Sequence, residues 1–217
     1  MENKIICSIG VEHYDVIHYL ASTGVVLGKR VLVTDLSGDG SMMATVPSAV
    51  FANKVTEYVG VDFSDSAEFL IKHAKDYDYV FVYLGMGAQT IPAWAEEVYV
   101  FTDCQKHHLA ALSNVKLKAN QYRKLIIRGS IDSKDYKQYA LTVLKNFNFD
   151  EKEIVEMPFN ENDLNAMLAV QYNGDYRFLG VSSEIKDLIY KFYEVDFEEK
   201  EITKSIRSLT KRKGGIV

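Results

Sequence analysis

The sequence has few of the residues that interrupt regular structure or build covalent frameworks. Of 217 residues, only three are proline and two are cysteine, and no linker rich in Pro, Gly or Ser divides the chain. Hydrophobic residues make up 47% of it, which excludes a mainly disordered state. No stretch approaches the roughly 20 apolar residues that a membrane span requires. We therefore expect a globular domain held by its own core.

Two further absences concern location and partners. Cys7 and Cys104 lie far apart, and the first residues carry neither a basic leader nor a long apolar stretch. We therefore expect a reduced, cytoplasmic protein without a signal peptide. The formal net charge of −5 argues against general nucleic-acid binding, because neutralising phosphates needs clustered Lys and Arg. No specific nucleic-acid partner is expected.

Short apolar runs alternate with amphipathic segments along most of the chain. This alternation predicts an α/β fold, with a doubly wound, mostly parallel sheet flanked by helices. The expected strands are Lys4–Ile9, Arg30–Leu36, Tyr79–Leu84, Glu97–Thr102, Lys124–Arg128 and Ile154–Glu156. The expected helices are Asp15–Leu27, Ser66–Lys75, Gln105–Asn114, Ser133–Phe147, Leu164–Ala169 and Ser183–Tyr193. We assign residues 1–194 to this domain and residues 195–217 to a polar, basic tail.

Five segments, in their order and spacing, resemble the ParA/MinD family of P-loop ATPases, whose Walker A motif deviates from the usual one. The resemblance covers nearly the whole chain to about Tyr193. The segments are residues 28–41 (GKRVLVTDLSGDGS), 77–85 (YDYVFVYLG), 95–102 (AEEVYVFT), 125–128 (LIIR) and 156–160 (EMPFN). The resemblance implies a P-loop NTPase-like fold of ParA/MinD type, with its site beyond the carboxyl ends of the strands.

The loop that would bind phosphate departs from that family. A P-loop holds phosphate through glycine backbone amides, a lysine, and a Ser or Thr on Mg²⁺. Residues 10–15 read GVEHYD, several residues shorter and without lysine. His13 aligns with the Walker lysine, Glu12 with the glycine before it, and Tyr14 and Asp15 with two hydroxyl residues.

Two other catalytic positions of the family are also substituted. The aspartate that orients the attacking water aligns with Ser37, and the Walker B aspartate aligns with Tyr83. Phosphoryl transfer depends on positioning and on charge stabilisation, so we expect a pseudo-ATPase with no catalytic residue, no cofactor and no metal. The degenerate nucleotide site comprises Gly10, Val11, Glu12, His13, Tyr14, Asp15, Asp35, Ser37, Tyr83, Arg128 and Pro158.

Several of these residues allow two interpretations. His13 is either a general base oriented by Glu12 or Asp15, or part of a solvated loop. Asp35 either keeps a ligand role or caps the loop that follows it. Residues 85–87 (GMG) form a switch-like loop or a permissive turn. Cys104, His107 and His108 have a spacing that suggests a metal, but they begin an expected helix without further ligands. Tyr79, Phe81 and Tyr83 are expected in the core.

Two surfaces are candidates for partner binding. The family's face-to-face dimers imply a homodimer through Tyr14, Gly38, Asp39, Met42 and Met43. The tail resembles the basic amphipathic helix with which MinD-like proteins bind membranes, through Lys204, Ile206, Arg207, Lys211, Arg212 and Lys213. Its apolar face is small, so only weak contact with the inner membrane surface would be available, and a solvated, flexible tail is the favoured interpretation.

The resemblance implies a scaffold or localisation factor. Short members of this superfamily that lack the motifs resemble the TadZ/CpaE group, which positions pilus or secretion machinery. One alternative is a nucleotide switch that binds ATP and Mg²⁺ weakly near Arg128 and Pro158–Asn160. Another is an α/β enzyme that uses His13 with a carboxylate.

Overall fold

One mixed sheet organises the chain. The structure is a computed structural model that describes residues 3–47, 55–118, 121–130, 134–173, 178 and 180–211. The strands follow the order β3-β4-β2-β5-β1-β6-β7-β8 and pair in parallel, except for the antiparallel pair β3 and β4. They are β1 (Lys4–Gly10), β2 (Val31–Asp35), β3 (Thr56–Tyr58), β4 (Val61–Ser64), β5 (Tyr79–Tyr83), β6 (Glu97–Thr102), β7 (Tyr122–Ser130) and β8 (Ile154–Pro158).

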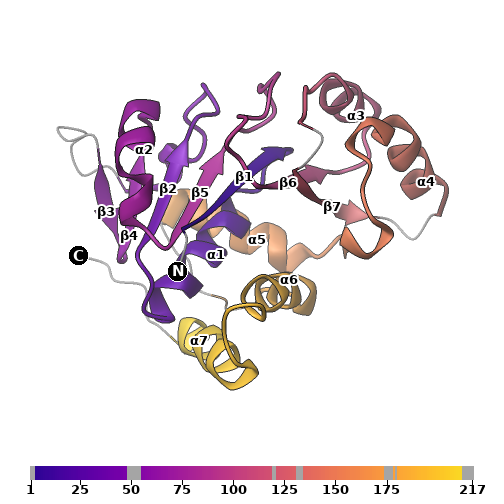
Figure 1. The fold of residues 1–217 in the computed structure, drawn as a ribbon. Coiled ribbons are helices and arrows are strands. Elements are labelled where there is room, and N and C mark those ends of the chain that lie inside the picture. Colours follow the sequence, from indigo (N-terminus) through magenta and orange to yellow (C-terminus); the bar gives the residue numbers. More distant parts are fainter. Residues whose placement is uncertain are drawn as a thin grey trace.

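Helices cover both faces of this sheet (Figure 1). On one face lie α2 (Ala67–His73), α3 (Lys106–Ser113) and α4 (Lys134–Val143). On the other lie α1 (Tyr14–Val26), α5 (Glu161–Asn173), α6 (Ser183–Tyr193) and α7 (Glu199–Lys211). Two separate clusters of buried hydrophobic side chains fill the two layers. The expected α/β fold with a mostly parallel sheet is confirmed.

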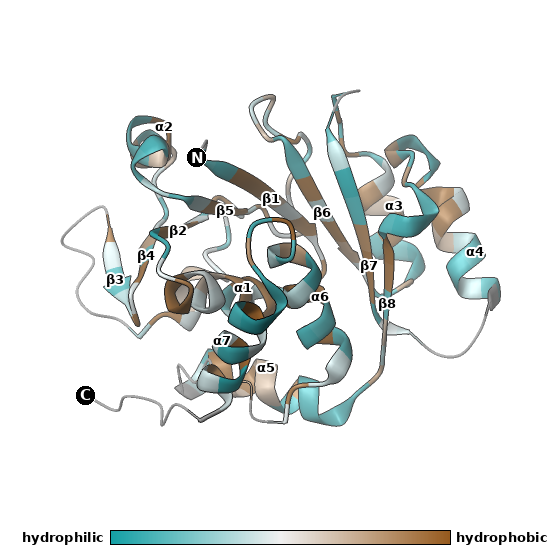
Figure 2. Cartoon of the chain, turned by 60° about the horizontal axis from the view of Figure 1, so that its bottom comes forward, coloured by the Kyte–Doolittle hydropathy of each residue, from teal (hydrophilic) through white to brown (hydrophobic). Residues whose placement is uncertain are grey.

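The central strands are buried on both faces. The five residues of β2 and of β5 are all buried, which explains why these segments are continuous apolar runs rather than alternating ones. Figure 2 shows hydrophobic residues concentrated along the inner strands. Tyr79, Phe81 and Tyr83 are buried in the core as predicted. Gly28 has φ +80° just after α1, so it ends this helix in the left-handed conformation that glycine adopts readily.

The hairpin β3–β4 was missed by the sequence analysis. Its strands are three and four residues long, too short for a periodic signal. Several elements also differ in length from the prediction, α5 and α4 most of all. Helix α5 extends beyond Leu164–Ala169 at both ends, and α4 stops at Val143 before a 3₁₀ turn at Lys145–Phe147.

The prediction of a solvated tail is wrong over Glu199–Lys211. These residues form α7, which packs against α1 and α6. Ile202 and Leu209 are buried and Ile206 packs against the same hydrophobic cluster, so the apolar stripe of this helix is used inside the molecule. The division after Glu194 therefore does not separate α7 from the domain. Arg212, Lys213 and the side chain of Lys211 lie outside the described residues.

Candidate functional site

The loop after β1 lies at the carboxyl edge of the sheet and is tightly enclosed. Gly10 has φ +122°, and a Cβ there would lie 1.9 Å from the carbonyl oxygen of Phe101. The amide of Gly10 donates to the Gly85 carbonyl (3.0 Å), and that of Val11 donates to the Phe101 carbonyl (3.1 Å). Strand ends on both sides therefore hold the loop, and only a glycine fits at its first position.

The imidazole of His13 fills the space beneath this loop. It stacks on Phe101 (centroids 4.1 Å apart, planes at 5°) and lies 4.5 Å from the Tyr83 ring. Burial lowers the pKa of His13 to about 3, so the ring is neutral at pH 7. Nδ1 therefore donates to the Val11 carbonyl (2.6 Å), and Nε2 has no hydrogen-bond partner among the described residues. The interpretation of His13 as part of a solvated loop is wrong, and its enclosure also argues against a general base.

An ion pair occupies the N-terminus of α1. Asp15, in the first turn of that helix, is fully buried, and its two oxygens accept from Arg128 Nη1 (2.8 Å) and Nη2 (2.9 Å). Nη1 also donates to the Glu12 carbonyl (2.9 Å). Burial alone would lower the pKa of Arg128, but the Asp15 carboxylate more than offsets it and raises that pKa. Both residues were predicted to lie in the site, but their pairing was not.

This pair gives the helix N-terminus an internal anion. The free amides and dipole at such a terminus favour negative charge, which is how phosphate is held in P-loops. Here the Asp15 carboxylate supplies that charge, and Arg128 neutralises it in a fixed bidentate geometry. A phosphate at this position would have to displace Asp15 or Arg128 from its partner.

Asp35 caps the loop that follows β2. Its Oδ1 accepts from the Ser37 amide (2.9 Å), and its Oδ2 accepts from the Met43 amide (2.9 Å). Ser37 Oγ lies 2.6 Å from Asp35 Oδ1 and 2.7 Å from Asp39 Oδ1. Hydrogen bonds from Ser37 and Ser41 lower the pKa of Asp39. Of the two roles left open for Asp35, this geometry accounts for the cap.

Three side chains of the expected dimer face are unavailable to a partner. Tyr14, Met42 and Met43 are buried in the hydrophobic cluster beside α1, while Gly38 and Asp39 are exposed. Tyr14 Oη donates instead to Gln171 Oε1 of α5 (3.4 Å). The predicted dimer contact is therefore wrong for Tyr14, Met42 and Met43, because these side chains already pack within their own chain, and it stays a prediction for Gly38 and Asp39.

A cavity of about 440 Å³ lies beside the loop, between the ends of β6, β7 and β8 and helix α5. Its lining combines charged and apolar side chains, among them Glu12, Asp103, Arg128, Pro158, Phe159 and Asp163. Acidic groups outnumber the one arginine in this lining, which is already paired with Asp15. The electrostatic potential of the cavity therefore opposes a polyphosphate.

The remaining candidate groups have simpler roles. His108 Nδ1 lies 2.8 Å from Asp103 Oδ1, and Cys104 is half-buried beside them. Within the described residues, no three His, Cys, Asp or Glu side chains gather as metal ligands. Gly85 has φ +59°, and a Cβ on it would approach the Ser37 Cβ to 2.9 Å, so the 85–87 loop packs closely on the loop after β2.

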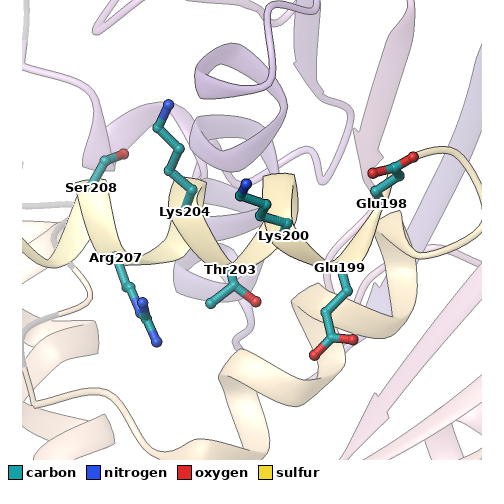
Figure 3. A pocket seen from close by; sticks show the side chains of 7 residues that line it. All are labelled: Glu198, Glu199, Lys200, Thr203, Lys204, Arg207 and Ser208. Carbon is teal, nitrogen blue, oxygen red and sulfur yellow. The ribbon is translucent and has the colours of Figure 1, made fainter.

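The basic face of α7 points to solvent. Lys204 and Arg207 are exposed and line a broad, shallow groove of about 870 Å³ (Figure 3). Its lining is Glu198, Glu199, Lys200, Thr203, Lys204, Arg207 and Ser208. Among the described helices, none is long and apolar enough to cross a bilayer. With Ile202 and Leu209 buried, contact with a membrane through α7 would be limited to these charged groups.

Comparisons with known proteins identify the fold. No protein-family model and no curated protein matches the sequence. An ATP complex of a McdA variant from Cyanothece matches with a TM-score of 0.51 at 11% identity, over 98% of this chain and 98% of that chain. The structure of pNOB8 ParA bound to nonspecific DNA matches with a TM-score of 0.50 at 12% identity, over 95% of this chain and 99% of that chain. The MinC:MinD complex from Aquifex aeolicus matches with a TM-score of 0.50 at 12% identity, over 99% of this chain and 98% of that chain. The chain thus has the fold of ParA/MinD-type P-loop ATPases.

Proposed function

We propose that this chain is a ParA/MinD-like protein without ATPase activity, which acts through protein contacts as a scaffold or localisation factor. The observation that carries the proposal is the buried ion pair between Asp15 and Arg128 at the N-terminus of α1. It supplies, from within the chain, the negative charge that a nucleotide would bring. The neutral His13 imidazole stands where the resemblance places the Walker lysine, and it carries no charge to stabilise a leaving phosphate.

The proposed setting follows from resemblance. TadZ/CpaE-like proteins position pilus or secretion machinery, and a protein with this fold and no nucleotide chemistry fits such a positioning role. Its partner in that role would be another protein of the machine, at the cytoplasmic side. The exposed charges of α7 offer only weak electrostatic contact with an anionic membrane surface.

The test is isothermal titration calorimetry with ATP and ADP in the presence of Mg²⁺. We expect no binding up to about 1 mM nucleotide, which corresponds to less than about 4 kcal/mol of binding free energy. Release of inorganic phosphate from ATP should equal that of the buffer. Micromolar binding, or phosphate release above the buffer, would overturn the proposal.

A weak nucleotide switch is the second candidate, because a cavity of about 440 Å³ lies next to Arg128 and Pro158. Light scattering with and without MgATP separates the two functions. A switch changes its mass when nucleotide is added, whereas the scaffold keeps the same mass in both samples. Arg128→Ala provides the control, since it should abolish any nucleotide response that depends on this cavity.

A further inference from the structure

We propose that the cavity of about 440 Å³ beside the loop after β1 binds an organic cation, an ammonium or guanidinium group on an aliphatic stem. Two sources supply this chemistry, a free alkylamine or the Lys or Arg side chain of a protein partner. The inference rests on the proposed function, because a nucleotide in this cavity would occupy the same space.

The charged groups of the cavity select the sign of the ligand. Three carboxylates line it, from the loop after β1 (Glu12), the residue after β6 (Asp103) and the first turn of α5 (Asp163). Arg128 is the one cation in the described lining, and its charge is matched by Asp15. The cavity therefore has an excess of negative charge, which attracts a cation and repels an anion.

Asp163 is the most enclosed of these carboxylates. It is 8% exposed, and its Oδ1 accepts a hydrogen bond from the Ser182 amide (2.7 Å). Its Oδ2 makes no hydrogen bond or ion pair with the described residues. The nearby Arg128 interacts with this charge, but its Nη atoms bond to Asp15 and to the Glu12 carbonyl instead. A carboxylate buried to this degree is ordinarily paired, and the cation of the ligand would supply the missing partner.

Asp103 also carries its charge at neutral pH. Burial raises the pKa of its carboxyl, but hydrogen bonds from His108 Nδ1 (2.8 Å) and from the Gln105 amide (3.0 Å) more than offset this and lower that pKa. These bonds also hold the carboxylate in one orientation. Glu12 is exposed, so its carboxylate adds attraction at longer range rather than a fixed contact.

The arrangement of these carboxylates favours an organic cation over a metal ion. Within the part of the chain that the structure describes, no three His, Cys, Asp or Glu side chains gather as metal ligands. The three carboxylates are therefore too widely spaced to surround one ion. They are spread around a cavity whose remaining lining is largely apolar, which suits a cationic group attached to an apolar stem.

The apolar lining provides the surface for that stem. Met157 and Ile185 are almost fully buried and form the inner part of the lining. Phe159 and Leu164 are 66% and 41% exposed, so they stand at the rim. The flexible side chains of Met157 and Met167 adapt to the shape of an alkyl chain, and the ring of Phe159 can cover either the stem or the face of the cation.

Nuclear magnetic resonance of the methionine methyl groups tests the proposal on the full chain. Of the six methionines, Met157 and Met167 line the cavity, whereas Met42 and Met86 lie outside it. Hexylammonium should shift only the first two signals, with a dissociation constant on the order of 1 mM for so small a ligand. Hexanoate, which has a similar stem and the opposite charge, should shift neither of them up to about 10 mM.

Asp163→Asn tests the role of the buried carboxylate. The asparagine oxygen can still accept from the Ser182 amide, so the charge is lost while this contact is kept. The affinity for hexylammonium should fall about tenfold or more. Asp187→Asn is the matched control, because it makes the same substitution at an exposed position of α6 outside the cavity and should bind like the wild type. Circular dichroism checks that both variants are folded.

A second cation identifies the source. N-acetyl-argininamide presents a guanidinium on an aliphatic stem between blocked peptide groups, as a protein side chain does. Tighter binding of this compound than of hexylammonium supports the inference and assigns the site to a protein partner. Tighter binding of hexylammonium also supports it and assigns the site to a free amine.

Three results would overturn the inference. Neither cation shifts Met157 and Met167 up to about 10 mM, or hexanoate shifts them equally, or a folded Asp163→Asn variant binds hexylammonium like the wild type. MgATP added to the same labelled protein separates this inference from the proposed function. Shifts caused by micromolar MgATP would contradict the proposed function, whereas loss of the response to cations alone leaves that function standing.

Discussion

Asp15 and Arg128 form the contact on which the loop after β1 depends. A buried charge is tolerated only when it is paired and hydrogen-bonded, and this pair satisfies both conditions with two parallel bonds and a third to the Glu12 carbonyl. The pair ties the first turn of α1 to the end of β7, 113 residues away in the sequence. The pair therefore both opposes a phosphate at the N-terminus of α1 and fixes the loop between β1 and α1.

Removing the charge of Asp15 should destabilise the fold. Asp15→Asn keeps the size of the side chain but removes the carboxylate that pairs with the Arg128 guanidinium, which is only 14% exposed. We expect the free energy of unfolding to fall by about 3–5 kcal/mol, measured by urea denaturation. Asp65→Asn, at an exposed carboxylate, should change it by less than about 0.5 kcal/mol.

A double variant checks that the two residues act as a pair. Combining Asp15→Asn with Arg128→Met removes both charges of the pair, so most of the lost stability should return. If the two substitutions instead add their separate costs, the pair is not coupled, and the anion at the helix N-terminus has another counter-charge.

At the scale of elements, the C-terminal helix changes the interpretation of the basic residues. The stripe of Ile202, Ile206 and Leu209 is amphipathic in the sequence, and such a stripe serves equally well for a membrane, a partner or the chain's own core. In the structure these side chains pack in the core, where α7 contacts α1 and α6. The basic residues face outward because the apolar ones face inward.

The two faces of α7 should respond differently to substitution. Ile202→Ala removes a fully buried side chain, so we expect a loss of about 2–4 kcal/mol in the free energy of unfolding. Lys204→Ala, at an exposed position two residues along the helix, should change it by less than about 0.5 kcal/mol. Thermal and urea denaturation measure both. Equal, small effects would mean that α7 does not contribute to the core.

The sequence predicted the strands that are long apolar runs, but it did not predict elements too short to show a hydrophobic pattern. The inner strands are buried on both faces, so their composition alone identifies them, and the order of helices and strands then limits the topology. The short β3–β4 hairpin has no such signal. The enclosure of His13 was missed because nothing in residues 10–15 indicates that Phe101, about 90 residues later, stacks on it.

For the whole molecule, two buried histidines make stability depend on pH. Burial lowers the pKa of His13 and of His18 to about 3, from an ordinary value of 6.5. Between pH 6.5 and 3 the unfolded chain therefore binds protons that the folded chain does not. The contribution of these histidines to the free energy of unfolding is thus fully present above pH 6.5 and is lost as the pH falls below that value. Between pH 8 and pH 5, protonation of each histidine in the unfolded chain should lower the free energy of unfolding by about 2 kcal/mol.

Replacing His13 should remove its part of this pH dependence of stability. His13→Phe keeps a ring against Phe101 and Tyr83 and cannot be protonated, so its loss of stability between pH 8 and pH 5 should be smaller than that of the wild type by about 2 kcal/mol. Urea denaturation at the two pH values measures the difference. An unaltered dependence in His13→Phe would mean that His13 is protonated equally in the folded and unfolded chains.

The packing of α7 on α1 also determines when the fold can be completed during synthesis. Helix α1 leaves the ribosome long before α6 and α7, which follow it in the chain and cover its outer face. The hydroxyl of Tyr193 on α6 donates to the Leu20 carbonyl of α1 (2.7 Å), a bond that closes a loop of 173 residues. At about 5–20 residues per second, the nascent chain carries an uncovered apolar helix for roughly ten seconds or more. During that time α1 is a natural target for a chaperone, and a chain that stops before α7 would keep that surface.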